Sequence, residues 1–390
     1  MRSFSSAIIL LVCMMLMCYF NWTTTTQITS QSRSLQQQPP EPLRSKELLQ
    51  VLQTQGPNIS KLIRESASIY FCPESQEVLW QHYPPLNYED CPDNSTFYAF
   101  PTLGGMTNSL KFVILGALMS VEDGRCFIGS NGVTRQYFQP MGLRYTHRLY
   151  SAAIHTGSMR RIFWQTTWND ERLRRVERYE YDFTNVTTFG YSHPDPHVNG
   201  ISLKRDFIRR FWQLKPEFRE STCQSLQKDH HNLLQKDYIA FSVRRGDKES
   251  EGFRFPSMLE YIHAAEPIIE ANGAENKTIF VATDDCKVMN ELRHMRPDWN
   301  FESQCDYLQD NTNNEGFVLH KLNRLNSTQR DAHFQKFFTE IYALAMSKVF
   351  IGVSYTNVAW FVYMLRPDGL DKATFQLLDI NSDFDALSAW

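Results

Sequence analysis

The segment Tyr238–Lys248, "YIAFSVRRGDK", joins an apolar run to a cluster of charged residues. Aromatic and β-branched residues dominate the apolar run, and this composition predicts a buried strand at 237–244. Beyond it, helical and strand patterns alternate to the end of the chain. They predict helices at 256–272, 284–295 and 328–347 and strands at 277–283, 299–303, 348–354 and 374–380. Such alternation predicts an α/β fold with a parallel sheet that carries helices on both faces.

Four charged residues stand where the first of these strands ends, namely Arg244, Arg245, Asp247 and Lys248. Ligands of parallel sheets bind beyond the carboxyl ends of the strands. Two adjacent guanidinium groups bind phosphate oxygens in pairs without a metal, and Asp247 would orient one of them. A structural ion-pair cluster is the alternative. An adhesive Arg-Gly-Asp tripeptide is a third interpretation, but it requires a projecting, exposed loop.

Length and charge limit the classes of protein to consider. The chain has 390 residues, 42% of them hydrophobic, which suits two domains with appendages. Its formal net charge of −3 supplies no broad basic field, so we expect no nucleic-acid partner. Any anion must be held by a local cluster.

The N-terminus contains an uninterrupted apolar run, residues 7–20, after Arg2. Its length is typical of a signal peptide, but the residues that follow it are mostly large, which disfavours cleavage. We therefore predict an uncleaved type II anchor at 7–22, with residues 1–6 cytosolic and the body lumenal. Residues 23–57, rich in Thr, Ser, Gln and Pro, predict a stem that begins as a polar tract and ends in a short helix.

Two further features fit a lumenal body. Five Asn-X-Ser/Thr sequons begin at Asn58, Asn94, Asn185, Asn276 and Asn326. Six cysteines lie beyond the anchor, an even number that suits disulfides in an oxidising compartment. Cys72 and Cys91 are our predicted first pair because they are close in the sequence.

The first half of the body has weaker patterns. A glycine pair, Gly104-Gly105, precedes an apolar helix that is predicted to reach Ser120, and a short strand is predicted at 126–128. An amphipathic helix is predicted at 201–214, ending near Pro216. His193 and His197 lie on a Pro-rich loop without an evident third ligand, so no metal site is predicted.

Three motifs in order, "SVRRGDK", "VATDD" and "KVFIGVSYTNVAW", resemble those of the α1,6/α1,2 and protein O-fucosyltransferase superfamily. The similarity is greatest to the core α1,6-fucosyltransferases, of glycosyltransferase family 23. The resemblance implies a GT-B-like enzyme with an acceptor-side α/β domain at 58–225 and a Rossmann-like domain at 226–390. It also implies GDP-fucose as donor substrate, no metal or other cofactor, and residence in the Golgi membrane.

The resemblance also implies roles for individual residues. Arg244 and Arg245 would bind the diphosphate, Glu340 would accept hydrogen bonds from guanine, and Thr356 and Asn357 would lie beside the phosphates. Asp284 and Asp285 would line the donor site, although paired carboxylates at a helix start more often cap the helix.

A general base is expected shortly after Lys248, and the segment offers Glu249 and Glu251, of which we assign Glu251. Lys248 would link the base to the diphosphate. Ser242 departs from the family pattern, which has a histidine there.

The sequence thus predicts an inverting fucosyltransferase that acts on a glycan or glycoprotein acceptor, with the α1,6 position of an N-glycan core as first choice. Protein O-fucosylation remains open as an alternative. A catalytically inactive lumenal protein that binds a glycan or nucleotide is the contrasting class. The sequence favours no oligomeric state.

Overall fold

The computed structural model describes residues 58–83, 212–231, 236–246, 254–271, 277–307, 324–367 and 374–379. Shorter pieces and single positions are described elsewhere between residues 50 and 233 and at 322. Residues 45–390 belong to one compact unit. The predicted boundary at residue 225 stays a prediction.

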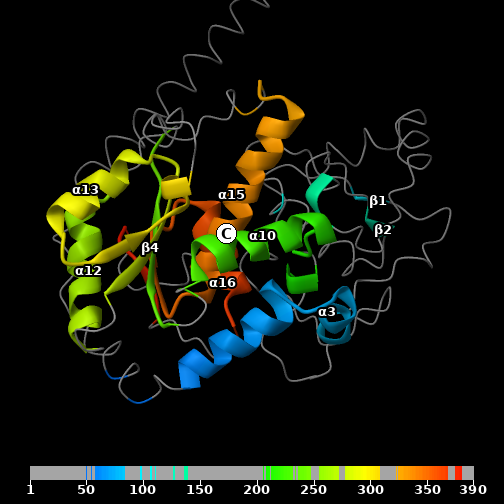
Figure 1. Cartoon of the computed structure of the whole chain (residues 1–390), viewed down its shortest axis with the longest axis horizontal. Helices are drawn as coiled ribbons and strands as arrows, with labels where there is room; N and C mark the ends of the chain where they lie inside the picture. The colour runs from blue at the N-terminus through cyan, green and yellow to red at the C-terminus, as the bar shows by residue number, and fades with distance from the viewer. Residues whose placement is uncertain are drawn as a thin grey trace, which may run out of the picture. The chain divides into compact units, whose positions relative to one another are not determined.

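A five-stranded parallel sheet forms the centre of the C-terminal half (Figure 1). Its spatial order is β5-β4-β3-β6-β7, so β3 lies between β4 and β6. The strands span Ile239–Val243 (β3), Thr278–Thr283 (β4), Asn300–Glu302 (β5), Val349–Gly352 (β6) and Phe375–Leu377 (β7). All pairings are parallel, in the registers Ile239↔Ile279 and Ile239↔Val349 around β3. The predicted α/β fold with a parallel sheet is confirmed.

Both faces of this sheet are covered, because alternate residues of each strand point to opposite sides. Phe241 and Val281 pack against α12 (Met258–Ala271) and α13 (Lys287–Met295) in one core. Ala240 and Phe280 pack in a second core, which also holds α15 (Ser327–Met346), α16 (Asn357–Leu365) and Leu226 of α10 (Pro216–Asp229). Figure 1 shows the two groups of helices on either side of β4.

Helix α15 is the longest described element, and its start shows why it begins where it does. The side chain of Asn326 accepts a hydrogen bond from the backbone N–H of Gln329, and the Gln329 side chain accepts one from the backbone N–H of Asn326. This capping box satisfies N–H groups that the helix itself leaves unpaired. From Phe338 to Met346 every residue is buried, so the second half of the helix is fixed between the sheet and the N-terminal segments.

The prediction for residues 201–214 is wrong at its C-terminal end. Arg205 and Ile208–Arg210 are helical, but Trp212 and Gln213 are not, and Leu214 forms an antiparallel bridge with Phe138. Pro216 begins α10 rather than ending the preceding helix. Proline is well suited to the first turn of a helix, because the N–H that it lacks would have no partner there.

In the first half, residues 58–66 are helical and run into η1 (Ala67–Phe71). Further elements are α3 (Gln76–His82) and the parallel pair β1 (Phe97–Tyr98) and β2 (Cys126–Phe127). Strand β2 confirms the predicted strand at 126. The predicted helix after the glycine pair has three described residues, Met106, Thr107 and Leu110, and all are helical. The ring of Phe71 lies 4.9 Å from that of Tyr342, so η1 packs directly on α15.

The predicted pairing of Cys72 with Cys91 is wrong. Cys72 forms a disulfide with Cys223, 151 residues away, with a Cα–Cα distance of 5.7 Å. Packing of η1 near α10 brings these two cysteines together. The separation of two cysteines in the sequence does not predict such packing. A second disulfide joins Cys286 to Cys305.

No helix within the described part of the chain is long and apolar enough to cross a membrane. The predicted anchor at 7–22 and most of the predicted stem lie outside the described residues.

Candidate functional site

Residues from four elements meet at the carboxyl end of the sheet. Arg244 and Arg245 follow β3, Asp284 and Asp285 follow β4, and Thr356 and Asn357 follow β6. Since β3 lies between β4 and β6, the arginine pair lies between the other two pairs. Glu340 reaches the same edge from α15, where Asp284 affects its pKa. Seven of the predicted donor-site residues therefore share one edge of the sheet.

Arg244 and the start of the following turn are fixed by Asp284. One carboxylate oxygen pairs with the guanidinium of Arg244, and the other accepts a hydrogen bond from the backbone N–H of Arg245 at 2.8 Å. Gly246 then adopts a φ of 73°, a conformation that favours glycine and turns the chain away from the strand direction.

Arg245 is held by a residue that the sequence analysis missed. Its two terminal nitrogens each donate to one oxygen of Glu291 at 2.8 Å, and Nη1 also lies 3.5 Å from Asp285. The hydrogen bonds to Glu291 raise the pKa of Arg245, and the same bonds lower the pKa of Glu291. Within the described residues, Nε has no hydrogen-bond partner. The Nε edge of the guanidinium is therefore left for another anion.

The acidic pair does not have the geometry of a metal site. Asp285 accepts a hydrogen bond at 3.1 Å from the backbone N–H of Lys287, the first residue of α13, but the N-cap position of this helix is occupied by Cys286. Asp284 instead binds the two arginines. Among the described residues no group of three His, Cys, Asp or Glu residues is placed to hold a metal ion. Asp285 therefore contacts the start of α13 without being its N-cap, and Asp284 holds the arginine pair.

Glu340 is a buried carboxylate with an unused acceptor. Its Oε1 accepts no hydrogen bond from any described group, although Nζ of Lys336 forms an ion pair with it at 3.6 Å. Burial raises the pKa of Glu340 to about 7, and Lys336 opposes this rise while Asp284 adds to it. A buried polar atom without a partner is costly, so this oxygen is a strong candidate for contact with a ligand.

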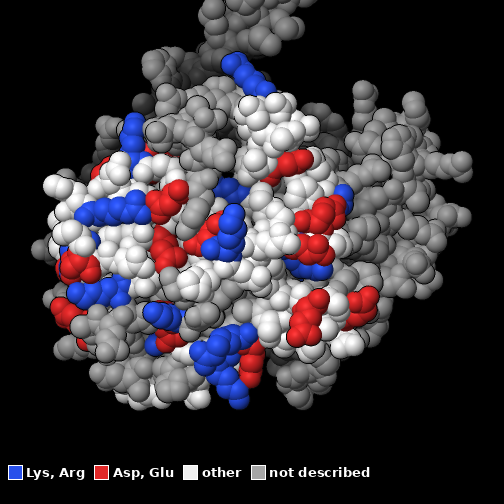
Figure 2. Space-filling view, in the orientation of Figure 1, with Lys and Arg blue, Asp and Glu red and all other residues white. Residues whose placement is uncertain are grey.

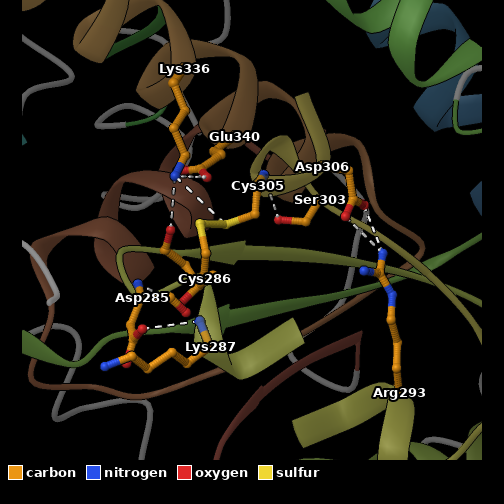
Figure 3. The surroundings of a disulfide bond; sticks show 10 residues. Asp285, Cys286, Lys287, Arg293, Ser303, Cys305, Asp306, Lys336 and Glu340 are labelled. Carbon is orange, nitrogen blue, oxygen red and sulfur yellow. Dashed lines mark hydrogen bonds and ion pairs between the residues drawn. A yellow bond between two sulfur atoms is a disulfide. The ribbon is translucent and has the colours of Figure 1, made fainter. Parts of the chain in front are cut away.

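Figure 3 shows how Lys336 is held beside Glu340. Its ammonium group donates to the backbone oxygen of Thr283 at 3.3 Å and lies 4.0 Å from the sulfur of Cys305. Cys305 is joined to Cys286, which directly follows Asp284 and Asp285. The disulfide therefore links the ends of β4 and β5 beneath this lysine.

His333 lies one turn before Lys336 and was also missed by sequence reasoning. Burial lowers the pKa of His333 to about 4, helped by the charges of Lys336 and Arg244. The imidazole is thus neutral at physiological pH. The spacing of 333, 336 and 340 on one predicted helix was the available signal for this cluster.

The polar pair after β6 is positioned by helix capping. The hydroxyl of Thr356 accepts a hydrogen bond from the backbone N–H of Ala359, which starts α16. Next to it, Ser354 donates to Asp379 from both its backbone N–H and its hydroxyl, at 2.7 and 2.6 Å. Asn357 is the first residue of the helix.

The remaining predicted residues fall in parts of the chain that are not described. The segment after Gly246, with Asp247, Lys248, Glu249 and Glu251, lies outside the described residues, as does the loop of His193 and His197. On the face shown in Figure 2, described Lys and Arg residues are interspersed with Asp and Glu. That view agrees with a local rather than a broad basic region.

The raised pKa of Glu340 has a consequence for stability. A carboxyl group whose pKa is higher in the folded state binds its proton more tightly there. The protonated group therefore adds to the free energy of unfolding at low pH, and this stabilisation is lost as pH rises. Between pH 5 and pH 8, the free energy of unfolding of the natural protein should fall by about 2–3 kcal/mol relative to that of Glu340→Gln. Urea unfolding of both proteins at the two pH values measures this difference, and parallel pH profiles would contradict it.

The fold and the site together define an α/β protein with an arginine pair and a buried carboxylate at the carboxyl edge of a parallel sheet. No model of a protein family and no curated protein sequence matches the chain. Solved structures to which it is similar include fucosyltransferases, the group of enzymes that the three sequence motifs resemble.

Three of these solved structures illustrate the similarity. One is NodZ α-1,6-fucosyltransferase soaked with GDP-fucose, at 12% identity over 70% of this chain and 94% of that chain, with a TM-score of 0.41. Another is POFUT1 in complex with GDP, at 11% identity over 74% and 98% of the two chains, with a TM-score of 0.42. A third is a mutant of Arabidopsis thaliana FUT1 in complex with GDP, at 10% identity over 86% and 82%, with a TM-score of 0.40. At identities this low, none of these likenesses assigns an activity to this chain.

Proposed function

We propose that this chain is a glycosyltransferase that transfers L-fucose from GDP-fucose to a glycan acceptor without a metal ion. One observation carries the proposal: two adjacent, carboxylate-braced guanidinium groups and a buried carboxylate with an unused oxygen lie at the same edge of a parallel sheet. The first pair suits a diphosphate and the second group suits a purine base with N–H donors.

The arginine pair would bind the diphosphate and stabilise its charge as it leaves. The Nε edge of Arg245 has no described partner, and a planar guanidinium binds phosphate oxygens two at a time. When the bond between fucose and the diphosphate breaks, negative charge grows on the leaving phosphate, and fixed positive charge there lowers the barrier. Since two arginines supply that charge, the step needs no divalent cation.

Glu340 would bind the guanine. An ionised carboxylate accepts hydrogen bonds from both N1–H and the 2-amino group of guanine, which neutral amides do less well. Burial around Glu340 strengthens such bonds, because no water competes for the oxygen. Thr356 and Asn357, next to the arginines, would contact the phosphates as the family resemblance implies.

Activation of the acceptor belongs to the segment after Gly246. We assign Glu251 as the base that accepts the proton of the attacking hydroxyl, with Lys248 between it and the diphosphate and Asp247 orienting one guanidinium. Attack on the face opposite the departing GDP would invert the anomeric carbon. The α1,6 position of an N-glycan core is the proposed acceptor, in a GT-B-like enzyme that a single N-terminal helix anchors in the Golgi membrane.

A second candidate, a nucleotide-binding protein without catalysis, is favoured by one feature. Glu291 occupies the terminal edge of Arg245, so the positive charge of this guanidinium is already offset by a carboxylate within the protein. An arrangement of this kind holds a diphosphate less tightly than a free arginine pair would. The same contact argues against an adhesive Arg-Gly-Asp tripeptide, whose arginine must be available to a large partner.

The test is a transfer assay with the full-length protein in mild detergent, labelled GDP-fucose, and a panel of N-glycans and folded acceptor domains, with and without EDTA. We expect labelled glycan at equal rates in both conditions. Label on a folded domain instead would indicate protein O-fucosylation. Binding of GDP without transfer or donor hydrolysis would establish the second candidate, and absence of GDP binding would refute both.

A further inference from the structure

Lys336 and Glu340 are one turn apart on α15, and both side chains are largely buried. Their side chains are 12% and 11% exposed, and Nζ of Lys336 lies 3.6 Å from Oε1 of Glu340. A lysine with so little contact with water is expensive to keep charged unless it has close partners. The burial of Lys336 therefore indicates that it does more than form a surface ion pair.

Three groups fix the ammonium of Lys336 in place. Besides Glu340, these are the backbone oxygen of Thr283 at 3.3 Å and the sulfur of Cys305 at 4.0 Å. Thr283 ends β4, and Cys305 is joined by a disulfide to Cys286, so neither partner moves freely (Figure 3). The positive charge is held at a set distance from the carboxylate.

The charges that face Glu340 come from two elements. Lys336, on α15, favours the ionised carboxylate, while Asp284, after β4, and burial favour the protonated acid. Arg244 is paired with Asp284, and His333 has a neutral ring at physiological pH. Lys336 is thus the described cation that opposes protonation of Glu340.

We infer that Lys336 is a positioning residue that favours the ionised form of Glu340 and thereby makes the nucleotide site selective for guanine over adenine. This inference rests on the proposed function. An ionised carboxylate has only acceptors, which match the adjacent N1–H and 2-amino donors of guanine. It repels adenine, which offers an acceptor at N1 beside its amino donor. A protonated carboxyl group, with one donor and one acceptor, matches adenine instead.

The experiment measures the affinities of GDP and ADP by calorimetry between pH 6 and pH 9, for the natural protein, Lys336→Gln and Lys336→Arg. Glutamine keeps a donor for the oxygen of Thr283 but removes the charge, and arginine keeps the charge. Lys336→Gln should bind GDP about fivefold more weakly than the natural protein at pH 7, because a rise of about one unit from a pKa of about 7 lowers the ionised fraction from about one half to about one tenth. Most of that loss should be recovered at pH 9, and binding of ADP should be unchanged or tighter. Lys336→Arg should follow the natural protein.

Titration of the phosphates of GDP is common to all variants, so Glu340→Gln serves as the reference in which this carboxyl group is absent. Lys336→Met provides a second neutral variant in case the glutamine side chain disturbs folding. An equal loss of GDP affinity at pH 7 and pH 9 would show a merely structural lysine and overturn the inference. So would unchanged selectivity in both neutral variants. If the natural protein binds no GDP at any pH, the proposed function fails and this inference fails with it.

Discussion

Replacement of Arg245 by alanine is expected to weaken GDP binding at least about 100-fold, or about 3 kcal/mol. Two effects add. The variant loses the guanidinium edge that we assign to the diphosphate, and it leaves Glu291 and Asp285 as uncompensated negative charges beside the bound phosphates. Arg245→Lys should recover only part of this affinity, because an ammonium group cannot make two parallel hydrogen bonds. Calorimetry with GDP measures both variants.

Arg293 provides a matched control for this experiment. It also lies on the α13 side of the sheet and pairs with a carboxylate, through Nη2 to both oxygens of Asp306 at 2.9 and 2.8 Å. Arg293→Ala should leave the affinity for GDP within about twofold of the natural value, since exposed ion pairs contribute little. Equal losses in the two alanine variants would mean that Arg245 acts through stability alone. Unchanged GDP affinity in Arg245→Ala would refute the arginine site.

Removal of the disulfide between Cys72 and Cys223 should have the largest effect on stability. It closes a loop of 151 residues, and cross-linking so long a loop restricts the unfolded chain by about 4–5 kcal/mol. The paired substitution of both cysteines by alanine should therefore lower the free energy of unfolding by about that amount. The double substitution avoids a free thiol. Urea unfolding under non-reducing conditions makes the measurement.

The second disulfide is the internal control for this prediction. Cys286 and Cys305 are only 19 residues apart, so their removal should cost less, about 3 kcal/mol. A larger loss from the short loop would contradict the entropic argument. A chain that is equally stable with and without Cys72 and Cys223 would contradict the pairing itself.

The strands and most helices of the C-terminal half follow from local patterns. All five strands were predicted, since each is a short apolar run between polar turns, and the alternation with helices determined that they are parallel. Helix α16 was missed because "NVAWFVYML" is apolar on every side and shows no helical period. The helix predicted at 201–214 was too long at its C-terminal end. Its apolar spacing continues up to Leu214, which instead forms a β-bridge with Phe138.

For the site, too, local patterns predicted some residues and missed others. The motifs placed six residues at strand and helix ends, which topology brings to one edge: Arg244, Arg245, Asp284, Asp285, Thr356 and Asn357. The family resemblance added Glu340, which lies within α15. Glu291, His333 and Lys336 were not found, because each lies within a helix whose facing neighbour is set by packing. The spacing of residues 333, 336 and 340 on one predicted helix was the available local signal for His333 and Lys336, and Glu291 had none.

Local patterns were thus enough to predict the parallel α/β sheet, because the sheet follows from the period and order of elements along the chain. The ligand site at its carboxyl edge stays a prediction. Only the tertiary structure decided that Cys72 pairs with Cys223, that Glu291 holds Arg245, and that Lys336 is fixed between Glu340 and the second disulfide. These contacts join residues that are far apart in sequence or lie on different elements. Their formation depends on which helix faces pack together, and that is a property of the whole folded chain.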